Sequence, residues 1–422
     1  MTRTLVVVGH GMVGHHLVQH LRARDPAGTW RVTVLAEEPR PAYDRTRLSS
    51  WLAGQGDHGT GGAAGPAPAG PDPAADPRVE LRLATPVTTV DRHHRAVRTA
   101  HGDLVGYDAL VLATGSRPLV PPVPGRELPG CFVYRTVEDL EAVRAAAVPG
   151  RPGVVVGGGL LGLEAAGALR RLGMRPHVVE LAPHLMPAQL DGAAGRLLAG
   201  YVTELGLTVR CGTALRSVEA GPGGRVRAVV LGDGTELEAD LVVFSTGIRP
   251  RDELAAPAGL ETGPRGGFLV DRRCRTADPH VWAIGECAAV EGRCYGLVSP
   301  GYRMAEAVAD QLLGLRDASF PGADLSTRLK LLGVDVASFG DAHASAQGAM
   351  ELVYADRAAR TYAKLVLAPD AGTLLGGILA GDAGAYPVLR SLVGRELPAS
   401  PERLLSSARC SRRSSSPAHS GR

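Results

Sequence analysis

The sequence predicts an α/β protein in which one strand–turn–helix unit occurs twice, followed by a smaller third domain. A run of β-branched residues leads into G-x-G-x-x-G and then a helix-like stretch at 4–14 and again at 154–164. A buried-type strand ending in Thr-Gly follows each time, at 109–115 and 241–247. A dinucleotide's pyrophosphate needs bare backbone N–H groups at a helix N-terminus. The repeat therefore indicates two Rossmann-like dinucleotide-binding domains.

The first copy begins with a strand at 4–8 and a helix from Met12 to about Arg24. A strand at 31–35 leads to Glu37 and Glu38, either of which meets the need for a ribose acceptor about 20 residues after the glycines. From 53 to 77 the chain is mostly Gly, Ala, Pro and Asp, so we expect a loosely held loop. Further strands are expected at 79–83, 87–90, 96–99 and 109–113, before a Pro-rich crossover at 118–129.

The second copy begins after a helix expected at 139–147. It has a strand at 154–156, a helix at 160–172 and a strand at 177–179, directly followed by Glu180. Asp191 is suited to cap the next helix, which runs to about residue 205. Later on, Ser299-Pro300 is a helix start signal. Strand-like runs at 337–339, 363–367 and 374–379 predict a small C-terminal α/β domain, and the Ser/Arg-rich end predicts disorder.

The composition excludes several classes of protein. No apolar run approaches the ~18 residues of a membrane helix, and the first strand starts too early for a signal peptide. Five of the 46 basic residues lie between Arg403 and Arg422, leaving 41 against 43 acidic residues, so no basic nucleic-acid surface is expected. The six cysteines show no framework spacing, which predicts reduced thiols and a cytoplasmic location.

Two further clusters of residues offer possible chemistry. His16 and His20 are four residues apart and would share one helix face, as metal ligands do. The HExxH pattern is absent and no third ligand is near in sequence, so we predict surface histidines and no metal site. Cys287 and Cys294 match no redox pattern, and we interpret them as ordinary thiols.

The motifs together resemble the two-dinucleotide-binding superfamily of pyridine nucleotide reductases. Within it, the chain resembles the N-terminal flavoprotein part of the large subunit of assimilatory NAD(P)H nitrite reductase. The matching stretches are PAYDRTRLSS, LVLATGSRPLVPPVPG, CFVYRTVEDLEAV, VVFSTGIRPRDEL, VWAIGECAAVEG, PGYRMAE and LKLLGVDVASFGDA. The resemblance implies an FAD-binding domain at 1–122 and 268–322, an inserted NAD(H)-binding domain at 123–267, a small domain at 325–405 and a disordered tail at 406–422.

The resemblance also implies the residues that hold FAD. Glu37 would bind the adenosine ribose, Val87 would offer backbone contacts to adenine, and Glu286 would accept from a ribityl hydroxyl. The helix N-terminus at Ser299 would face the flavin's pyrimidine edge. The implied FAD-binding set comprises Gly9, Gly11, Val13, Gly14, Glu37, Val87, Thr114, Gly115, Arg135, Gly285, Glu286 and Ser299.

For the second nucleotide, Gly157, Gly159 and Gly162 would hold the pyrophosphate, with Gly247 in the matching Thr-Gly turn. Glu180 would accept from a ribose 2′-OH and repel a 2′-phosphate, and no Arg or Lys follows through Pro187. This predicts NADH in preference to NADPH. Glu164 resembles the acid that orients the nicotinamide, although a solvated acid in the first helical turn is the alternative. Hydride would pass between the cofactors, with no acid–base residue needed.

These observations leave three alternative candidate functions. The first is the NADH-oxidising, FAD-dependent module of a nitrite reductase, passing electrons to a separate iron–sulfur and sirohaem subunit. The second is a free-standing NADH:ferredoxin or rubredoxin reductase, and the third is a truncated flavoprotein that binds nucleotides without turnover. Beyond Leu405 only Cys410 is available as a thiolate, so we expect the chain alone not to reduce nitrite.

Overall fold

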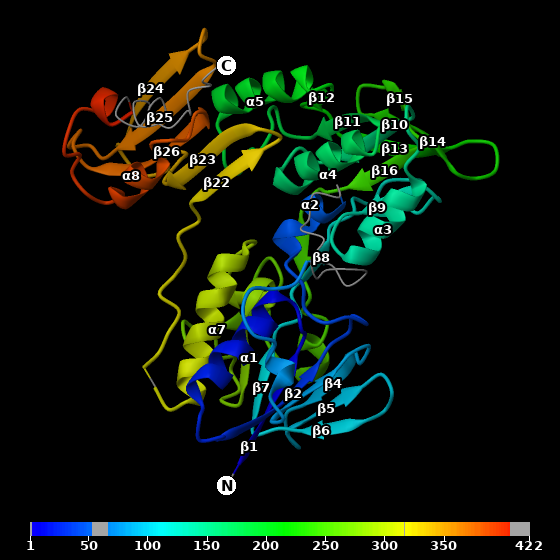
Figure 1. Cartoon of the computed structure of the whole chain (residues 1–422), viewed down its shortest axis with the longest axis vertical. Coiled ribbons are helices and arrows are strands. Elements are labelled where there is room, and N and C mark those ends of the chain that lie inside the picture. Colours follow the sequence, from blue (N-terminus) through cyan, green and yellow to red (C-terminus); the bar gives the residue numbers. More distant parts are fainter. Residues whose placement is uncertain (1, 53–65, 316, 406–422) are drawn as a thin grey trace, which may run out of the picture. The chain divides into compact units, whose positions relative to one another are not determined.

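The computed structural model describes residues 2–52, 66–315 and 317–405, which divide into two units. The first unit takes in residues 1–119, 135–141 and 248–323, and the second takes in residues 120–134, 142–247 and 324–422. Helix α3 (Val137–Ala146) has residues in both. Both units are drawn in Figure 1.

The first unit is built on a parallel sheet of strand order β19-β7-β1-β2-β3. Helices α1 and α7 lie side by side along it (Figure 1). Smaller sheets β4-β5-β6, β18-β20-β21 and β17-β8 complete the unit. Its elements are β1 (Arg3–Val8), α1 (Met12–Arg24), β2 (Trp30–Leu35), η1 (Arg45–Arg47), α2 (Leu48–Leu52), η2 (Pro73–Ala75), β3 (Val79–Arg82), β4 (Val87–Asp91), β5 (Ala96–Thr99), β6 (Leu104–Gly106), β7 (Ala109–Leu112), β8 (Ser116–Pro118), β17 (Ile248–Pro250), α6 (Ala255–Ala258), β18 (Phe268–Val270), β19 (Val281–Ala283), η3 (Gly285–Cys287), β20 (Ala288–Val290), β21 (Arg293–Cys294) and α7 (Val298–Leu312).

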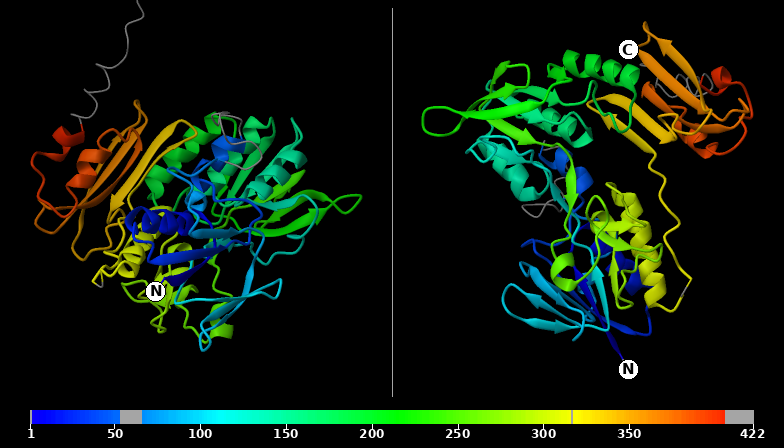
Figure 2. Two further views of the ribbon diagram at one scale, coloured as in Figure 1. Left: turned by 60° about the horizontal axis from the view of Figure 1, so that its bottom comes forward. Right: turned by 180° about the vertical axis from the view of Figure 1, so that it is seen from behind.

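The second unit repeats the parallel arrangement in the order β12-β11-β10-β16-β9 and adds an antiparallel sheet β22-β23-β26-β25-β24. Helix α5 contacts β25 and β26 of that sheet, and the two further views show them adjacent (Figure 2). Its elements are β9 (Cys131–Val133), β10 (Pro152–Val156), α4 (Leu160–Arg171), β11 (Arg175–Glu180), α5 (Gly192–Glu204), β12 (Thr208–Cys211), β13 (Leu215–Ala220), β14 (Val226–Leu231), β15 (Glu236–Glu238), β16 (Leu241–Phe244), β22 (Thr327–Leu331), β23 (Val334–Gly340), β24 (Met350–Asp356), β25 (Thr361–Leu367), β26 (Leu374–Gly381) and α8 (Tyr386–Ser391).

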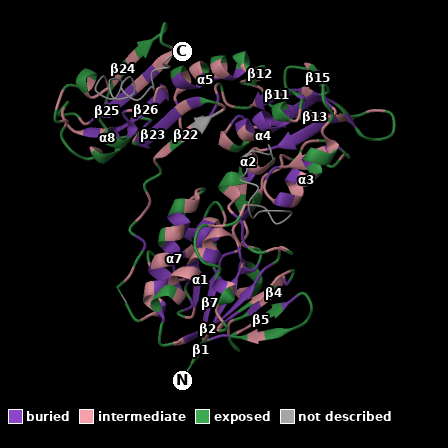
Figure 3. Ribbon diagram, in the orientation of Figure 1, coloured by how far each residue is buried: buried purple, intermediate pink, exposed green. Residues whose placement is uncertain are grey.

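The central parallel strands are buried almost completely (Figure 3). Residues 5–7 of β1 and 110–112 of β7 are fully buried, as are 154–155 of β10 and 241–243 of β16. Strands covered on both faces need continuous apolar sequence instead of alternation. The Val- and Leu-rich runs before each glycine motif and each Thr-Gly turn meet this requirement, and the α/β fold predicted from them is confirmed.

One local prediction was wrong for the residues that the structure describes. The loop expected at 53–77 is described only from residue 66, and there it is held in place: the Gln19 amide donates to the carbonyls of Ala69 and Pro71, at 3.2 and 3.0 Å. Asp72 caps η2 by accepting from the N–H of Ala74. The helix predicted to open at Ser299-Pro300 is confirmed as α7, which begins one residue earlier, at Val298, and no side chain caps it. The tail at 406–422 lies outside the described residues.

Among the residues that the structure describes, no helix combines the length and the apolar character needed to cross a membrane.

Candidate dinucleotide-binding sites

The first glycine loop connects β1 to α1 at the carboxyl edge of the first unit's sheet. Gly9 has φ +106°, and a Cβ there would clash with the carbonyl oxygen of Ala113 at the end of β7. A Cβ on Gly14 would clash with the carbonyl oxygen of Gly9. The Gly9 N–H donates to Leu35 O at 2.8 Å, which fixes the loop to β2. Glycine is therefore required at both positions by the backbone itself.

Gly11 has a different role in the same loop. It is the N-cap of the 13-residue helix α1, with extended backbone and no side-chain cap. A Cβ on Gly11 would meet nothing within 4 Å, so the chain leaves bare backbone and open space at this helix N-terminus. The first N–H groups of a helix have no intrahelical partner and carry partial positive charge. The loop therefore fits the pyrophosphate of a dinucleotide such as FAD.

The two acids after β2 point to different partners. Glu38 accepts from the Tyr43 hydroxyl at 2.8 Å and pairs with Arg45, both in the loop that follows. Glu37 pairs with Arg251 Nη1 at 2.5 Å, and about half of its side chain is exposed. Glu37, the acid that the family resemblance assigns to the ribose, is thus the one that is not tied to its own loop.

The Thr-Gly turn after β7 is fixed by Arg251, a residue the sequence analysis missed. The Thr114 hydroxyl donates to the carbonyl of Arg251 at 2.5 Å, and Arg251 N–H donates to the carbonyl of Gly115 at 2.9 Å. Gly115 itself has φ +70°, with open space where a Cβ would lie. No local pattern links Arg251 to Glu37 or Thr114, since it lies more than 130 residues away along the chain.

A second polar cluster gathers around Glu286 at the start of η3. Its Oε2 accepts from the Ser116 hydroxyl at 2.8 Å and from the Arg135 guanidinium. Arg135 is mostly buried, and its Nε has no partner among the described residues. The structure therefore brings together Arg135 and Glu286, two predicted flavin-site residues, and adds Ser116. The set offers a fixed acceptor and a fixed cation, which suits the ribityl chain or phosphates of FAD.

The other predicted FAD-site residues lie in three places. Val13 packs against Gly285 (φ +77°), and a Cβ on Gly301 would come within 2.6 Å of the same valine, so its side chain joins the starts of α1 and α7. Ser299 is an exposed residue in the first turn of α7. Val87 opens β4 and pairs with Thr99 of β5.

The second glycine loop has the same geometry in the other unit. Gly157 has φ +113°, and a Cβ there would clash with the carbonyl oxygen of Ser245 at the end of β16. A Cβ on Gly162 would clash with the carbonyl oxygen of Gly157. Gly159 is the uncapped N-cap of α4, and a Cβ there would meet nothing within 4 Å. A second helix N-terminus is thus open to a pyrophosphate.

The acid of the second site sits directly on its glycine loop. Glu180, the last residue of β11, accepts from the N–H of Gly158 at 2.6 Å and of Ala182 at 2.7 Å. Two N–H donors therefore fix its carboxylate beside the loop as an acceptor. Glu164 is half-buried in the first two turns of α4, and Gly247 (φ +122°) follows Thr246 in the matching Thr-Gly turn.

Two buried histidines lie under the first loop. Burial, with the nearby His15 as a second cause, lowers the pKa of His10 to about 4. Burial also lowers the pKa of His15, whose ring nitrogens have no partner among the described residues. His10 Nδ1 accepts from the N–H of Ala42 at 3.3 Å. Both rings are therefore neutral near pH 7, and the positive potential of the loop comes from its backbone.

The five described cysteines are free and poorly suited to attack a disulfide. Burial raises the pKa of Cys287 and Cys294, and the Cys287 thiol donates to the carbonyl of Ile284 at 3.2 Å. Burial also raises the pKa of Cys131 to about 11. The nucleophile in thiol chemistry is the thiolate, which these environments disfavour. They fit the interpretation of ordinary thiols.

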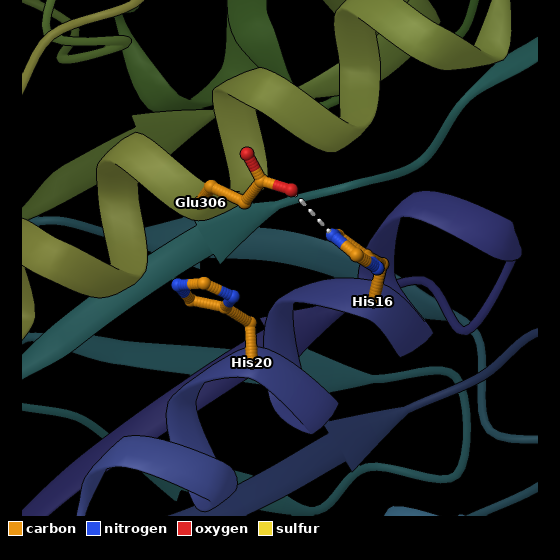
Figure 4. Close-up of side chains that lie close together, drawn as sticks. All are labelled: His16, His20 and Glu306. Carbon is orange, nitrogen blue, oxygen red and sulfur yellow. Dashed lines mark hydrogen bonds and ion pairs between the residues drawn. The ribbon is translucent and has the colours of Figure 1, made fainter. Parts of the chain in front are cut away.

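The histidines of α1 acquire a neighbour that their sequence spacing does not reveal. His16 Nε2 lies 3.1 Å from Glu306 Oε1 on α7 (Figure 4). His20 Nε2 lies 3.4 Å from Asp310 Oδ1. The potential ligand atoms of His16, His20 and Glu306 lie within 4.8 Å of one another. The guanidinium of Arg24 contacts both His20 and Asp310, and so already supplies a cation there. We interpret the cluster as polar pairing between α1 and α7, in keeping with the predicted surface histidines.

Comparisons with known proteins agree with this geometry. The pyridine nucleotide-disulphide oxidoreductase family model matches residues 3–309, and the rubredoxin NAD+ reductase C-terminal domain model matches residues 326–397. The large subunit of the nitrite reductase [NAD(P)H] of Klebsiella oxytoca is 47% identical over 95% of this chain, which spans 41% of that relative.

Two smaller relatives extend the comparison. The ferredoxin–NAD(+) reductase component of the biphenyl dioxygenase system of Paraburkholderia xenovorans is 34% identical, over 68% of each chain. The crystal structure of a ferredoxin reductase from Rhodopseudomonas palustris superposes with a TM-score of 0.82 and 28% identity, covering 96% of this chain and all of that one.

The family model spans both glycine loops and both Thr-Gly turns described above. The resemblance inferred from the motifs is confirmed, as are the predicted FAD and NAD(H) cofactors. The chain belongs to the pyridine nucleotide-disulphide oxidoreductase family and is an FAD-dependent NAD(P)H oxidoreductase.

Proposed function

We propose that this chain oxidises NADH through bound FAD and passes the electrons to a separate metal-containing acceptor, as the NADH-oxidising module of a nitrite-reducing system. The observation that carries this is the 47% identity to a nitrite reductase large subunit along 95% of the chain. The chain spans about two fifths of that relative, so the acceptor and the reduction of nitrite itself belong to the proposal.

In this proposal each cofactor has its own glycine loop. Gly11 and the N-terminus of α1 hold the FAD pyrophosphate, and Glu37 binds its ribose. The Ser116–Arg135–Glu286 cluster binds the ribityl chain or the phosphates of FAD. Gly159 and the N-terminus of α4 hold the pyrophosphate of the nicotinamide nucleotide. When bound, FAD would supply the chemistry that an iron–sulfur acceptor needs, namely reduction by hydride and release of single electrons.

The preference for NADH over NADPH remains a proposal and rests on Glu180. Its carboxylate accepts from two backbone N–H groups at the loop, and it would also accept from a ribose 2′-OH. A 2′-phosphate carries nearly two negative charges and would be repelled at this position. Glu164, on the same helix as Gly162, is proposed to orient the nicotinamide.

The domain boundaries are likewise proposals: FAD binding at 1–122 and 268–322, NAD(H) binding at 123–267 and a small domain at 325–405. We also propose a cytoplasmic location, because the five described cysteines are free thiols, as in a reducing compartment.

The second candidate is a free-standing NADH:ferredoxin or rubredoxin reductase. It is favoured by the match of residues 326–397 to a rubredoxin NAD+ reductase C-terminal domain and by the ferredoxin–NAD(+) reductase among the relatives. The third possibility, nucleotide binding without turnover, has less support, because both loops keep the glycines that their backbones require and both helix N-termini are open.

An anaerobic titration of the FAD-loaded protein with NADH tests the proposal. We expect the oxidised flavin band to bleach with about one equivalent of NADH, to stay bleached when nitrite is added, and to return when an oxidised sirohaem–iron–sulfur protein is added. Recovery with nitrite alone would contradict the need for a separate acceptor. Recovery with ferredoxin or rubredoxin but not with the sirohaem protein would favour the second candidate.

A further inference from the structure

Arginines line a cavity at the edge of the first unit's sheet opposite the glycine loop. The cavity has a volume of about 740 Å³ and includes Arg3, Arg95, Arg273 and Arg275 in its lining, together with Trp30 and Trp282. Arg3 and Trp30 are the first residues of β1 and β2. The glycine loop begins after the other end of β1, six residues or about 20 Å away. This cavity is therefore separate from the proposed FAD site.

The four guanidinium groups have no carboxylate partner within the described part of the chain. Most of the other arginines in this unit do form such pairs. Those with a carboxylate partner are Arg22, Arg24, Arg40, Arg45, Arg78, Arg82, Arg92, Arg117, Arg135, Arg251 and Arg272. Of the two acids in the lining, Asp108 accepts from the N–H of Thr4 at 2.7 Å, and Asp317 has no ion pair among the described residues. Four arginines against these two acids leave two positive charges in excess in the lining.

Stacking on tryptophan orients two of these arginines. The Arg3 guanidinium lies 4.2 Å from the centre of the Trp30 ring, and that of Arg275 lies 5.0 Å from the centre of Trp282. A stacked guanidinium uses its face on the ring and keeps its N–H edge for a planar or tetrahedral oxyanion. Within the described residues, the Arg3 guanidinium donates a single long bond of 3.5 Å, to the carbonyl of Leu312.

The other observation pointing to a ligand is a pair of unsatisfied buried donors. The Nε atoms of Arg273 and Arg275 are buried and have no partner among the described residues. Cys274 between them is fully buried with φ +59°, so the turn directs the core-facing side chain inward and leaves an arginine on either side. Most buried polar atoms in folded proteins have a partner, and a bound ion or water is one way to supply it.

We propose that this cavity binds a small molecule bearing a phosphate group. A phosphate monoester carries nearly two negative charges at pH 7, which equals the excess charge of the lining, and its oxygens accept paired N–H bonds from guanidinium edges. The cavity volume is in the range of small-molecule sites. The phosphate can belong to a nucleotide or to another phosphate ester, since the shared chemistry is the oxyanion.

Isothermal titration calorimetry tests this on the FAD-loaded protein with saturating NAD+, so that both glycine loops are filled. The probe is inorganic pyrophosphate, and the variants are the double substitution Arg273→Gln/Arg275→Gln and the matched control Arg272→Gln. Arg272 lies in the same turn, is largely exposed, pairs with Glu291 and does not line the cavity. We expect saturable binding that weakens at least tenfold in the double variant and less than twofold in the control.

Equal weakening by Arg272→Gln would show a diffuse charge effect and overturn the proposal, as would unchanged binding in the double variant or no binding by the wild-type protein. If the double variant loses its flavin, Arg275→Lys replaces it. That substitution keeps the positive charge but removes the paired N–H donors of the guanidinium, and it is expected to weaken binding several-fold. Titrations with ADP and with glycerol phosphate then separate nucleotides from other esters. Binding of heparin without binding of pyrophosphate would indicate that the ligand is a polyanion and not a small molecule, and would overturn the proposal.

Discussion

The two glycine loops, at 9–14 and 157–162, have the same backbone in different surroundings. In each, the first glycine has φ above +100° and faces the carbonyl that ends a neighbouring strand, and the last glycine faces the carbonyl of the first. The middle glycine opens a helix and faces open space. The motif therefore has two kinds of glycine: the first and last are required by the fold, and the middle one, we propose, by the ligand.

The surroundings differ at the residue after the first glycine and at the acid. The first loop has His10, which is buried, and its acid Glu37 is half-exposed and paired with Arg251. The second loop has Gly158, against which the acid Glu180 packs directly, with its carboxylate on the loop's own N–H. From this comparison we propose that the glycines set the shared pyrophosphate geometry, while the acid and its distance from the loop distinguish the two nucleotides.

The largest effect is expected from adding a methyl group to a glycine that the fold requires. Gly9→Ala and Gly157→Ala place a Cβ against a carbonyl at positive φ, so we expect each to lower the free energy of unfolding by about 3 kcal/mol. Gly159→Ala, with open space and φ −76°, is the matched control and should change it by less than about 1 kcal/mol. Urea unfolding followed by circular dichroism measures all three. Equal losses in Gly157→Ala and Gly159→Ala would refute the division into two kinds of glycine.

Acidification should lower the free energy of unfolding through the first loop, which contains His10, more than through the second. His10 has a pKa of about 4 in the folded chain against an ordinary value of 6.5, so only the unfolded chain binds a proton between these values. Stability is therefore complete above pH 6.5 and falls as the pH drops toward 4, by about 1.4 kcal/mol per pH unit. From pH 7.5 to pH 5.0 we expect a loss of about 2 kcal/mol from this residue.

Unfolding followed by flavin fluorescence at the two pH values checks this effect. The variant His10→Asn keeps a neutral acceptor for the Ala42 N–H and should lose less stability over the same interval. A wild-type protein whose flavin-reported stability does not change between pH 7.5 and pH 5.0 would be inconsistent with the buried, neutral histidine.

A smaller effect is expected from neutralising Glu180 and Glu37, the acids of the two sites. Glu180→Gln should raise the KM for NADH about tenfold, or about 1.4 kcal/mol, and should narrow the gap between NADH and NADPH. Glu37→Gln should instead weaken FAD about tenfold and leave the KM for NADH unchanged at saturating FAD. Steady-state kinetics with both nucleotides and a flavin titration of each variant give the comparison. An unaltered NADH/NADPH ratio in Glu180→Gln would remove the basis for the proposed NADH preference.

The sequence predicted what local spacing determines. The helix expected from Met12 to about Arg24 is α1, and Asp191 caps α5 by accepting from the N–H of Ala194, because caps and helix periodicity depend on neighbours in the chain. Glu37 and Glu38 could not be told apart from sequence alone, because the difference lies in which arginine each meets.

Contacts across long sequence distances were out of reach. Arg251 beside Glu37 and Ser116 beside Glu286 join segments more than 150 residues apart, and only the folded sheet brings them together. The same holds for Glu306 beside His16, and for the Gln19 amide that holds the segment after residue 66, where composition had indicated a loose loop.

The central claim is that the two loops divide the labour, the first holding FAD and the second NADH. The most direct test is to fill the open space at each helix N-terminus with the substitutions Gly11→Val and Gly159→Val. For each purified variant, the flavin content and the bleaching of the flavin by NADH without oxygen are measured. We predict that Gly11→Val is purified without flavin. Gly159→Val should hold a full complement of flavin that dithionite reduces but NADH does not. Loss of flavin from Gly159→Val, or its bleaching by NADH at the wild-type rate, would contradict the account.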